Sequence, residues 1–228
     1  MEIQKLQQEY LFVSLPNTLS CFIRLKQLGD IWIFNCFEGC QHVLNKHRVK
    51  ISQIKKIIIT NNNIESVSGL LGLLSSISLN TQTTRIDVYA PEGLHNYIFW
   101  GRQYSQTNFR YELYIHNVVN GLIDYQVNFN TYAFYKHTTK KVINYTIIFS
   151  EQAGSLDFMN VISYNIPSGP LYGFFKTGTN FILPDGFIAY SRNFIHGYYL
   201  GSKLLFVSKY MEQDFLNLLA HYDFLLYH

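Results

Sequence analysis

The stretch from residue 54 to residue 80 constrains the fold most, because it joins a buried strand, a polar loop and a buried helix. Three consecutive isoleucines, residues 57–59, form a β-branched run of strand length. Thr60 and three asparagines follow, and leucines then recur at helical spacing around Gly69 and Gly72, which permit close approach of other chain segments. This pattern predicts a strand–loop–helix unit of an open α/β sheet, in which ligands bind at the loop after the strand.

The bulk composition narrows the class of protein. A chain of 228 residues with a hydrophobic fraction of 48% can bury a large core, so one domain over residues 1–228 is expected, with two small domains as the alternative. The net charge of +3 permits contact with nucleic acid without demanding it. Three cysteines do not form a disulfide framework, and the sequence shows no secretory signal or membrane-length apolar run. We therefore expect a soluble protein that has no membrane partner.

Strand and helix signals continue along the chain. Three strands are expected at 9–15, 20–28 and 31–37, with a hairpin turn at Gly29 and Asp30 between the last two. A helix is expected from Gly39 to about His47, and Ser66 and Ser68 are candidate N-caps of the central helix. Further strands are expected at 85–90, 111–116, 125–129, 145–149 and 203–210, and further helices at 94–104 and 212–221.

Four potential zinc ligands, Cys36, Cys40, His42 and His47, follow the third strand. Their spacing, C-x₃-C-x-H-x₄-H, falls loosely within the range of zinc sites. However, all four lie on one strand end and one short helix, so they would not converge on a tetrahedral centre. Buried thiols and surface imidazoles are the favoured interpretation.

The central loop reads Thr60-Asn61-Asn62-Asn63-Ile64-Glu65-Ser66, and the helix after it reads GLLGLLSSISLN. This run resembles the metal-binding unit of ribonuclease Z, the tRNA 3′-processing branch of the metallo-β-lactamase superfamily, whose pattern is T-H-x-H-x-D-H before a Gly- and Leu-rich helix. At the family's four ligand positions the chain carries Asn61, Asn63, Glu65 and Ser66, and Glu65 stands at the position of the family's catalytic base. The resemblance implies an α/β fold, the metallo-β-lactamase αβ/βα four-layer sandwich.

The family's other zinc-ligand positions diverge as well, with one exception. The segment YAFYKH resembles the family's A-F-P-L-x-H and keeps its histidine as His137, whereas Lys209 replaces the aspartate that bridges the two metals, and Tyr227 replaces a late histidine. A catalytic zinc needs three protein ligands, so His137 alone cannot hold one. We expect no zinc cofactor and a Lys209–Glu65 ion pair in its place. Weaker Mg²⁺ or Ca²⁺ binding by the asparagine and Glu65 oxygens stays open.

A second match covers about residues 154–186. The segments IPSGPL and LPDG, with Gly178 between them, resemble the family's protruding Gly-Pro arm, which grips the tRNA elbow. The resemblance implies an RNA-binding arm with Gly169, Pro170 and Lys176 as its candidate contacts. The alternative is a Pro- and Gly-rich loop that only packs on the body.

Three functional hypotheses follow from the resemblance. The leading one is a degenerate ribonuclease Z-like protein that lacks two-zinc hydrolysis and keeps tRNA or partner binding through the arm. The alternatives are an active tRNA 3′-processing endoribonuclease and a structural partner in a homodimer or in a heterodimer with an intact homologue, since family members dimerise. Abundant Tyr, Phe, Asn and Ile indicate an AT-rich coding genome, so a plastid location is expected.

Overall fold

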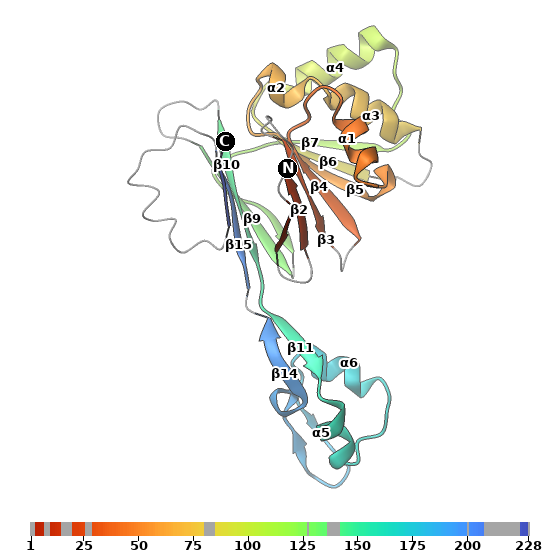
Figure 1. Cartoon of the computed structure of the whole chain (residues 1–228), viewed down its shortest axis with the longest axis vertical. Coiled ribbons are helices and arrows are strands. Elements are labelled where there is room, and N and C mark those ends of the chain that lie inside the picture. Colours follow the sequence, from red (N-terminus) through yellow and green to blue (C-terminus); the bar gives the residue numbers. More distant parts are fainter. Residues whose placement is uncertain are drawn as a thin grey trace.

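Two β-sheets lie face to face in the body of the molecule (Figure 1). The computed structural model describes residues 3–6, 10–14, 20–25, 29–79, 85–126, 128–135, 142–199, 201–207 and 224–227. The first sheet has its seven described strands in sequence order; β1 to β4 are antiparallel, and β4 to β7 are parallel. These strands are β1 (Ile3–Leu6), β2 (Tyr10–Ser14), β3 (Cys21–Leu25), β4 (Asp30–Phe34), β5 (Ile54–Ile58), β6 (Arg85–Ala90) and β7 (Glu112–Asn117).

The second sheet has the order β16-β15-β10-β9-β8 among the described residues. Its strands are antiparallel except for β15 and β16, which run parallel. The strands are β8 (Gly121–Gln126), β9 (Phe129–Tyr135), β10 (Ile143–Phe149), β15 (Lys203–Val207) and β16 (Phe224–Tyr227).

The prediction of a single strand at 125–129 is wrong. The chain instead reverses there, and β8 and β9 form a hairpin in which Gln126 is paired with Phe129. The apolar alternation of Tyr125, Val127 and Phe129 continues through the reversal, so the period-2 pattern hides the turn. The other expected strands and helices in the described part are found within one to a few residues, and the helix expected at 212–221 lies outside the described residues.

Four helices cover the outer face of the first sheet (Figure 1). The three isoleucines after Lys56 show why: Ile57 and Ile59 pack toward the helices, and Ile58 packs toward the second sheet. Successive side chains of a strand point to opposite faces, so a strand buried on both sides must be apolar throughout. The helices are α1 (Cys40–Lys46), α2 (Ile64–Val67), α3 (Leu70–Ser78) and α4 (Leu94–Ser105), with a 3₁₀ turn at Ile51–Gln53.

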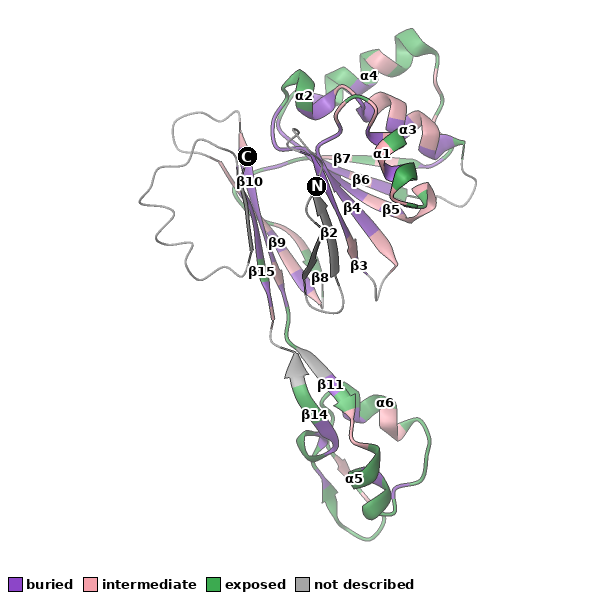
Figure 2. Cartoon of the chain, viewed as in Figure 1, coloured by how far each residue is buried: buried purple, intermediate pink, exposed green. Residues whose placement is uncertain are grey.

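Buried residues lie on the strands that face each other across the two sheets (Figure 2), and aromatic rings are prominent among them. Trp32 meets Phe129 edge to face, with ring centroids 4.7 Å apart, and Phe34 stacks on Phe206 at 4.8 Å. The buried Tyr145 hydroxyl donates a hydrogen bond across this core to the Ile59 carbonyl, 2.9 Å away. The second sheet thereby contacts the end of the central strand β5.

A separate lobe extends from the body on a two-stranded ribbon (Figure 1). The ribbon pairs β11 (Gln152–Leu156) with β14 (Ile195–Tyr199), and the lobe has a small core of its own around Phe175 and Phe194. The lobe runs from residue 152 to residue 199, so the arm expected at 154–186 omits the returning strand. Between the ribbon strands lie α5 (Phe158–Ser163), α6 (Leu171–Lys176), β12 (Phe181–Ile182), β13 (Ile188–Ala189) and a 3₁₀ turn at Ser191–Phe194.

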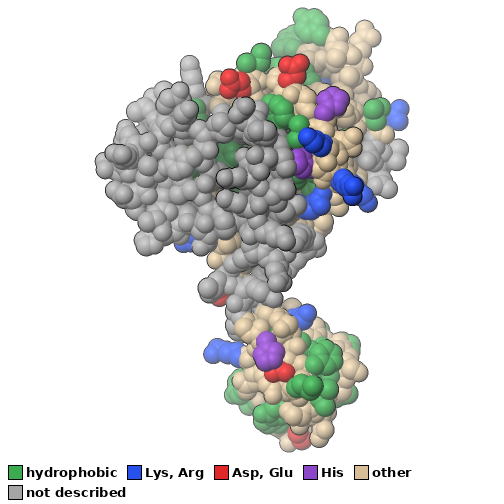
Figure 3. Space-filling view, viewed as in Figure 1, with side chains coloured by type: hydrophobic (Ala, Val, Ile, Leu, Met, Phe, Trp, Pro, Cys, Tyr) green, Lys and Arg blue, Asp and Glu red, His purple; other side chains and the backbone are tan. Residues whose placement is uncertain are grey.

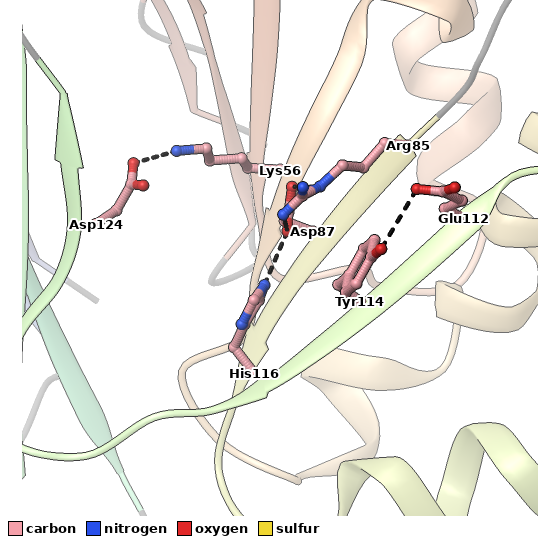
Figure 4. Close-up of polar contacts among 7 residues, drawn as sticks. All are labelled: Lys56, Arg85, Asp87, Glu112, Tyr114, His116 and Asp124. Carbon is pink, nitrogen blue, oxygen red and sulfur yellow. Dashed lines mark hydrogen bonds and ion pairs between the residues drawn. The ribbon is translucent and has the colours of Figure 1, made fainter.

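A buried ion pair joins the two sheets. Lys56 of β5 is 7% exposed, and its amine pairs with the Asp124 carboxylate of β8 (Figure 4). The same amine lies 4.5 Å from the centroid of the Trp32 ring. A buried charge is tolerated only when it is paired, so each partner depends on the other.

We predict that Lys56→Met destabilises the protein by about 3–5 kcal/mol, because it leaves the Asp124 carboxylate unpaired beside the core. The double variant Lys56→Met with Asp124→Leu is expected to lose far less, since no buried charge remains. Urea unfolding of both variants tests this. Equal losses in the single and double variants would show that the packing around Lys56, and not the pairing of charges, sets the cost.

Candidate functional site

The loop between β5 and α2 is held by its own asparagines. The Asn61 side chain is buried, and its Oδ1 accepts a hydrogen bond from the backbone N–H of Asn63 at 3.0 Å. Asn63 then serves as the N-cap residue of α2, in extended conformation. The prediction that Ser66 or Ser68 is the N-cap of the central helix is wrong. Ser66 lies inside α2, and the N-cap residue of α3 is Gly69.

Ser66 and Glu65 are neighbours in the short helix α2, but one is buried and the other is exposed. Ser66 is fully buried, its Oγ has no hydrogen-bond partner within the described part of the chain, and its carbonyl accepts a bond from the Cys36 N–H at 2.7 Å. Glu65 is exposed. The structure thus brings Asn61, Asn63, Glu65 and Ser66 into one loop. The side chains of His137, Lys209 and Tyr227, and the expected Lys209–Glu65 pair, lie outside the described residues.

Asn35 fixes this loop from the neighbouring strand. It follows β4 with a φ of 55°, and its Oδ1 accepts hydrogen bonds from both the N–H and the hydroxyl of Thr60, at 2.9 and 3.1 Å. Asparagine is among the residues that tolerate this left-handed conformation. Sequence reasoning assigned Asn35 no role. A polar residue at the end of an apolar strand was the available signal.

A cleft with a volume of about 1000 Å³ opens beside the loop. Amides dominate it: the Asn62 Nδ2 donates to the Glu92 carbonyl at 2.8 Å, and the Asn120 Oδ1 accepts from the Tyr135 N–H at 2.7 Å. The described lining residues include one carboxylate and no lysine, arginine or histidine. They are Asn62, Asn63, Pro91, Glu92, Gly93, Asn96, Asn117, Val118, Val119, Asn120 and Tyr135.

A second polar cluster, on β6 and β7, is internally paired (Figure 4). Asp87 accepts two bonds from Arg85, at 2.7 and 2.9 Å, and lies 2.8 Å from the His116 Nε2. Burial raises the pKa of the Asp87 carboxyl, but the hydrogen bonds from Arg85 and His116 together lower it below its ordinary value. All three side chains are partnered within the cluster, so a structural role accounts for it.

Comparisons with known proteins show which proteins this chain is similar to. No family profile matches the sequence. A ribonuclease Z of Acaryochloris marina is 38% identical over 194 residues, which cover 83% of this chain and 60% of the relative. An uncharacterized protein ycf56 of Porphyra purpurea is 34% identical over 181 residues, covering 79% and 69%. The human tRNase Z, short form, superposes with a TM-score of 0.51 at 26% identity over 57% of this chain and 56% of that structure.

This chain belongs to the ribonuclease Z-like family. Its fold is the expected metallo-β-lactamase fold. The ribonuclease Z-like chain spans about 60% of the length of the first curated ribonuclease Z relatives that it matches. No helix of the described part is long and apolar enough to cross a membrane.

At the central loop, the described residues of this ribonuclease Z-like chain offer oxygen donors and no histidine or cysteine. No three His, Cys, Asp or Glu side chains within the described residues lie close enough to share a metal. At the central loop the chain offers an amide oxygen that already accepts a hydrogen bond, and a buried hydroxyl. The candidate zinc ligands after β4 do not share one environment either. Cys36 and Cys40 are buried, whereas His42 is exposed. The hydrogen bond with Cys40, together with burial, raises the pKa of the Cys36 thiol, which keeps it protonated.

We predict that Gly69→Ala destabilises the protein by about 3 kcal/mol, because a Cβ there would lie 2.0 Å from the Phe37 carbonyl oxygen, a rigid backbone atom. The matched control is Gly173→Ala in helix α6, where a Cβ meets nothing within 4 Å. That change should stabilise slightly, by about 0.5–1 kcal/mol. Urea unfolding compares the two. A neutral Gly69→Ala would mean that α3 can move away from residue 37 without loss.

Proposed function

We propose that this protein binds tRNA without two-zinc hydrolysis, with the unpaired 3′ end in the amide-lined cleft and the lobe as a second contact. The observation that carries the proposal is that the side chains of Asn61 and Ser66 face the protein itself. At two of the family's metal-ligand positions these side chains serve the loop itself, one as a hydrogen-bond acceptor and the other as a buried hydroxyl.

The chemistry of the loop argues against hydrolysis. A catalytic zinc takes three protein ligands from His, Cys, Asp or Glu and keeps one open position for water. Bound water reaches a pKa near neutrality only through such a metal. An asparagine amide and a serine hydroxyl do not replace two histidines as zinc ligands. A phosphodiester in this cleft would therefore meet water that is not activated.

The cleft is better suited to nucleobases than to phosphates. Asn63, Asn96 and Asn117 line it, and no hydrogen bond from their side-chain amides to another described residue is found. Each amide offers a donor and an acceptor side by side, which matches the edge of an unpaired base such as adenine. The single carboxylate and the absence of cations among the described lining residues do not favour a phosphate.

The lobe supplies the second contact. Gly169, Pro170 and Lys176 are all exposed, and Pro170 is the N-cap residue of α6, which ends at Lys176. The exposed Gly-Pro backbone can approach a sugar-phosphate chain closely, and Lys176 adds a charge for a phosphate. With one lysine on α6, this contact would position the RNA more than it would add affinity.

We also propose that the protein works in the plastid. Two relatives named ycf56, from Porphyra purpurea and Pyropia yezoensis, are each 34% identical to this chain, and the Tyr-, Phe-, Asn- and Ile-rich composition is typical of an AT-rich organelle genome. Fractionation of the source cells followed by immunodetection tests this assignment.

We predict that the purified protein holds well below one zinc per chain and does not cleave precursor tRNA with added zinc or manganese, whereas it shifts the same RNA in a gel. Elemental analysis, a cleavage assay and a gel shift measure the three properties. Stoichiometric zinc with release of the 3′ trailer would establish the active endoribonuclease instead. Absence of both cleavage and binding would remove the RNA-binding proposal.

Two variants test the cleft and the lobe separately as contacts for RNA. Asn63→Ala with Asn117→Ala should weaken binding of tRNA that has an unpaired 3′ end by roughly 10- to 100-fold, and should leave a blunt-ended acceptor stem unaffected. Lys176→Gln should weaken both RNAs equally and reduce the salt dependence of binding. Ser168→Ala, an exposed change beside the Gly-Pro segment, is the control. Equal loss of both RNAs in the asparagine variant would place the 3′ end outside the cleft.

A further inference from the structure

A second pocket lies at the carboxyl end of helix α4. It has a volume of about 550 Å³, and we call it the α4 pocket. None of its residues lines the amide-lined cleft or belongs to the lobe, so it is separate from both contacts of the proposed function. The lining residues are Phe99, Arg102, Gln103, Gln106, Thr107 and Asn108.

Arg102 gives the α4 pocket a positive charge that is held in place. Its guanidinium lies over the Phe109 ring at 5.0 Å, and Phe109 stacks on Tyr111 with ring centroids 5.5 Å apart. Tyr111 is buried, and its hydroxyl donates to the Leu74 carbonyl of α3 at 3.0 Å. Arg102 has no ion-pair partner among the described residues. A guanidinium stacked on a ring keeps its N–H groups available for an anion.

The segment after α4 is tied to α3 and forms the other wall of the pocket. The Ser78 hydroxyl donates to the Asn108 carbonyl and accepts from the Arg110 N–H, both at 3.0 Å. Gln106 ends α4 with a φ of 52°, in the left-handed region that glycine usually occupies at a helix end. The chain therefore places a polar side chain at the pocket in a conformation that is unfavourable for it.

The groups of the α4 pocket are those that recognise a nucleotide. Gln103, Gln106 and Asn108 line it, and no hydrogen bond from their side-chain amides to another described residue is found. An amide offers a donor and an acceptor side by side, which matches the N6 and N7 edge of adenine. The Phe99 ring is 54% exposed and offers a face on which a base can stack. Arg102 supplies the charge for a phosphate.

The sequence around the pocket contains no acidic residue. Residues 93–111 include two arginines, Arg102 and Arg110, and no Asp or Glu, although the whole chain has 15. The carboxyl end of a helix carries a partial negative charge, and Arg102 in the last turn of α4 offsets it. An anionic ligand therefore meets cations here and no carboxylate of this segment.

Further aromatic rings continue from the pocket along α4. Trp100 lies 5.3 Å from Phe99, and Tyr104 lies 6.3 Å from Trp100, measured between ring centroids. Both side chains are more than half exposed. Figure 3 shows hydrophobic side chains exposed at the end of the molecule where α4 lies in Figure 1.

We propose that the α4 pocket binds an adenine nucleotide, with the base on Phe99, the base edge on the amides and the phosphate on Arg102. The nucleotide has two possible sources, a free nucleotide or one unit of a single-stranded RNA, in which Trp100 and Tyr104 would stack further bases. A lipid surface would also attract exposed rings and an arginine, but it would leave the three amides without hydrogen-bond partners. The site goes beyond the proposed function and does not rest on it.

Calorimetric titration of the full-length protein tests the proposal with AMP, UMP and an oligoadenylate of four nucleotides. AMP should bind at one site and at least about 10-fold more tightly than UMP, because uracil lacks the adenine edge. An oligoadenylate that binds about 10-fold or more tightly than AMP identifies a strand as the source, and equal affinity identifies the free nucleotide. Equal binding of AMP and UMP, or binding of neither AMP nor the oligoadenylate, would overturn the proposal.

Two variants separate the contacts to the phosphate and to the base. Arg102→Gln should weaken AMP by roughly 10-fold and leave adenosine unchanged, since adenosine has no phosphate. Phe99→Ala should weaken both by roughly 10-fold. Arg192→Gln and Phe158→Ala are the matched controls, because they remove an exposed arginine and a 57% exposed phenylalanine from the lobe. Losses in the controls equal to those in the α4 variants would show that the effect does not come from the pocket.

Tryptophan fluorescence locates the ligand. The chain has two tryptophans, Trp32, which is 1% exposed, and Trp100, which is 51% exposed and contacts Phe99. AMP should therefore quench Trp100 in the wild type and should no longer do so in Phe99→Ala. A protein that ignores AMP and the oligoadenylate but sediments with phosphatidylglycerol vesicles has a membrane-binding α4, which would overturn the proposal.

A variant of the cleft keeps this proposal distinct from the proposed function. Asn63→Ala with Asn117→Ala should bind AMP as the wild type does, whatever its effect on tRNA. AMP binding that is lost in this double variant and kept in Arg102→Gln would place the nucleotide in the cleft and overturn the α4 site. Either proposal can therefore fail alone.

Discussion

The hydrogen bonds between Asn35 and Thr60 hold the centre of this protein together. One amide oxygen accepts from both the N–H and the hydroxyl of Thr60, so the ends of β4 and β5 are fixed to each other where the polar loop begins. The adjacent Cys36 extends this bracket, since its N–H donates to the Ser66 carbonyl and its carbonyl accepts from the Gly69 N–H. Helices α2 and α3 are thereby placed against the sheet by neutral hydrogen bonds.

The part of the fold that depends on local pattern was predictable from the sequence. The run of isoleucines before a polar loop predicted β5, and the Leu- and Gly-rich stretch predicted α3, because a doubly buried strand and a packed helix leave strong periodic signals. The β8–β9 reversal was not predictable in this way, since Tyr125 and Phe129 continue one alternation across the turn. The lobe boundary failed for a related reason: β14 is paired with a strand about 40 residues earlier, and no local pattern encodes such a pairing.

In the candidate site, too, some features could be predicted from the sequence and others could not. The positions of Asn61, Asn63, Glu65 and Ser66 follow from the resemblance, but their environments do not. Only the structure shows that Ser66 is buried while Glu65 is exposed, because that depends on how a single helical turn is oriented against residue 36. Asn35 was missed because its role depends on a positive φ and a partner 25 residues away. The cleft was missed because its asparagines come from three separate segments.

A loop held by its own amides needs no metal to keep its shape, and thermal unfolding with and without zinc tests this most directly. We predict that the melting temperature is the same in excess EDTA and in excess zinc, within about 1 °C. A zinc site occupied at about 100 times its dissociation constant would add about 2.7 kcal/mol of stability. For a chain of this size that corresponds to a rise of roughly 5–10 °C, and such a rise would contradict a metal-free site.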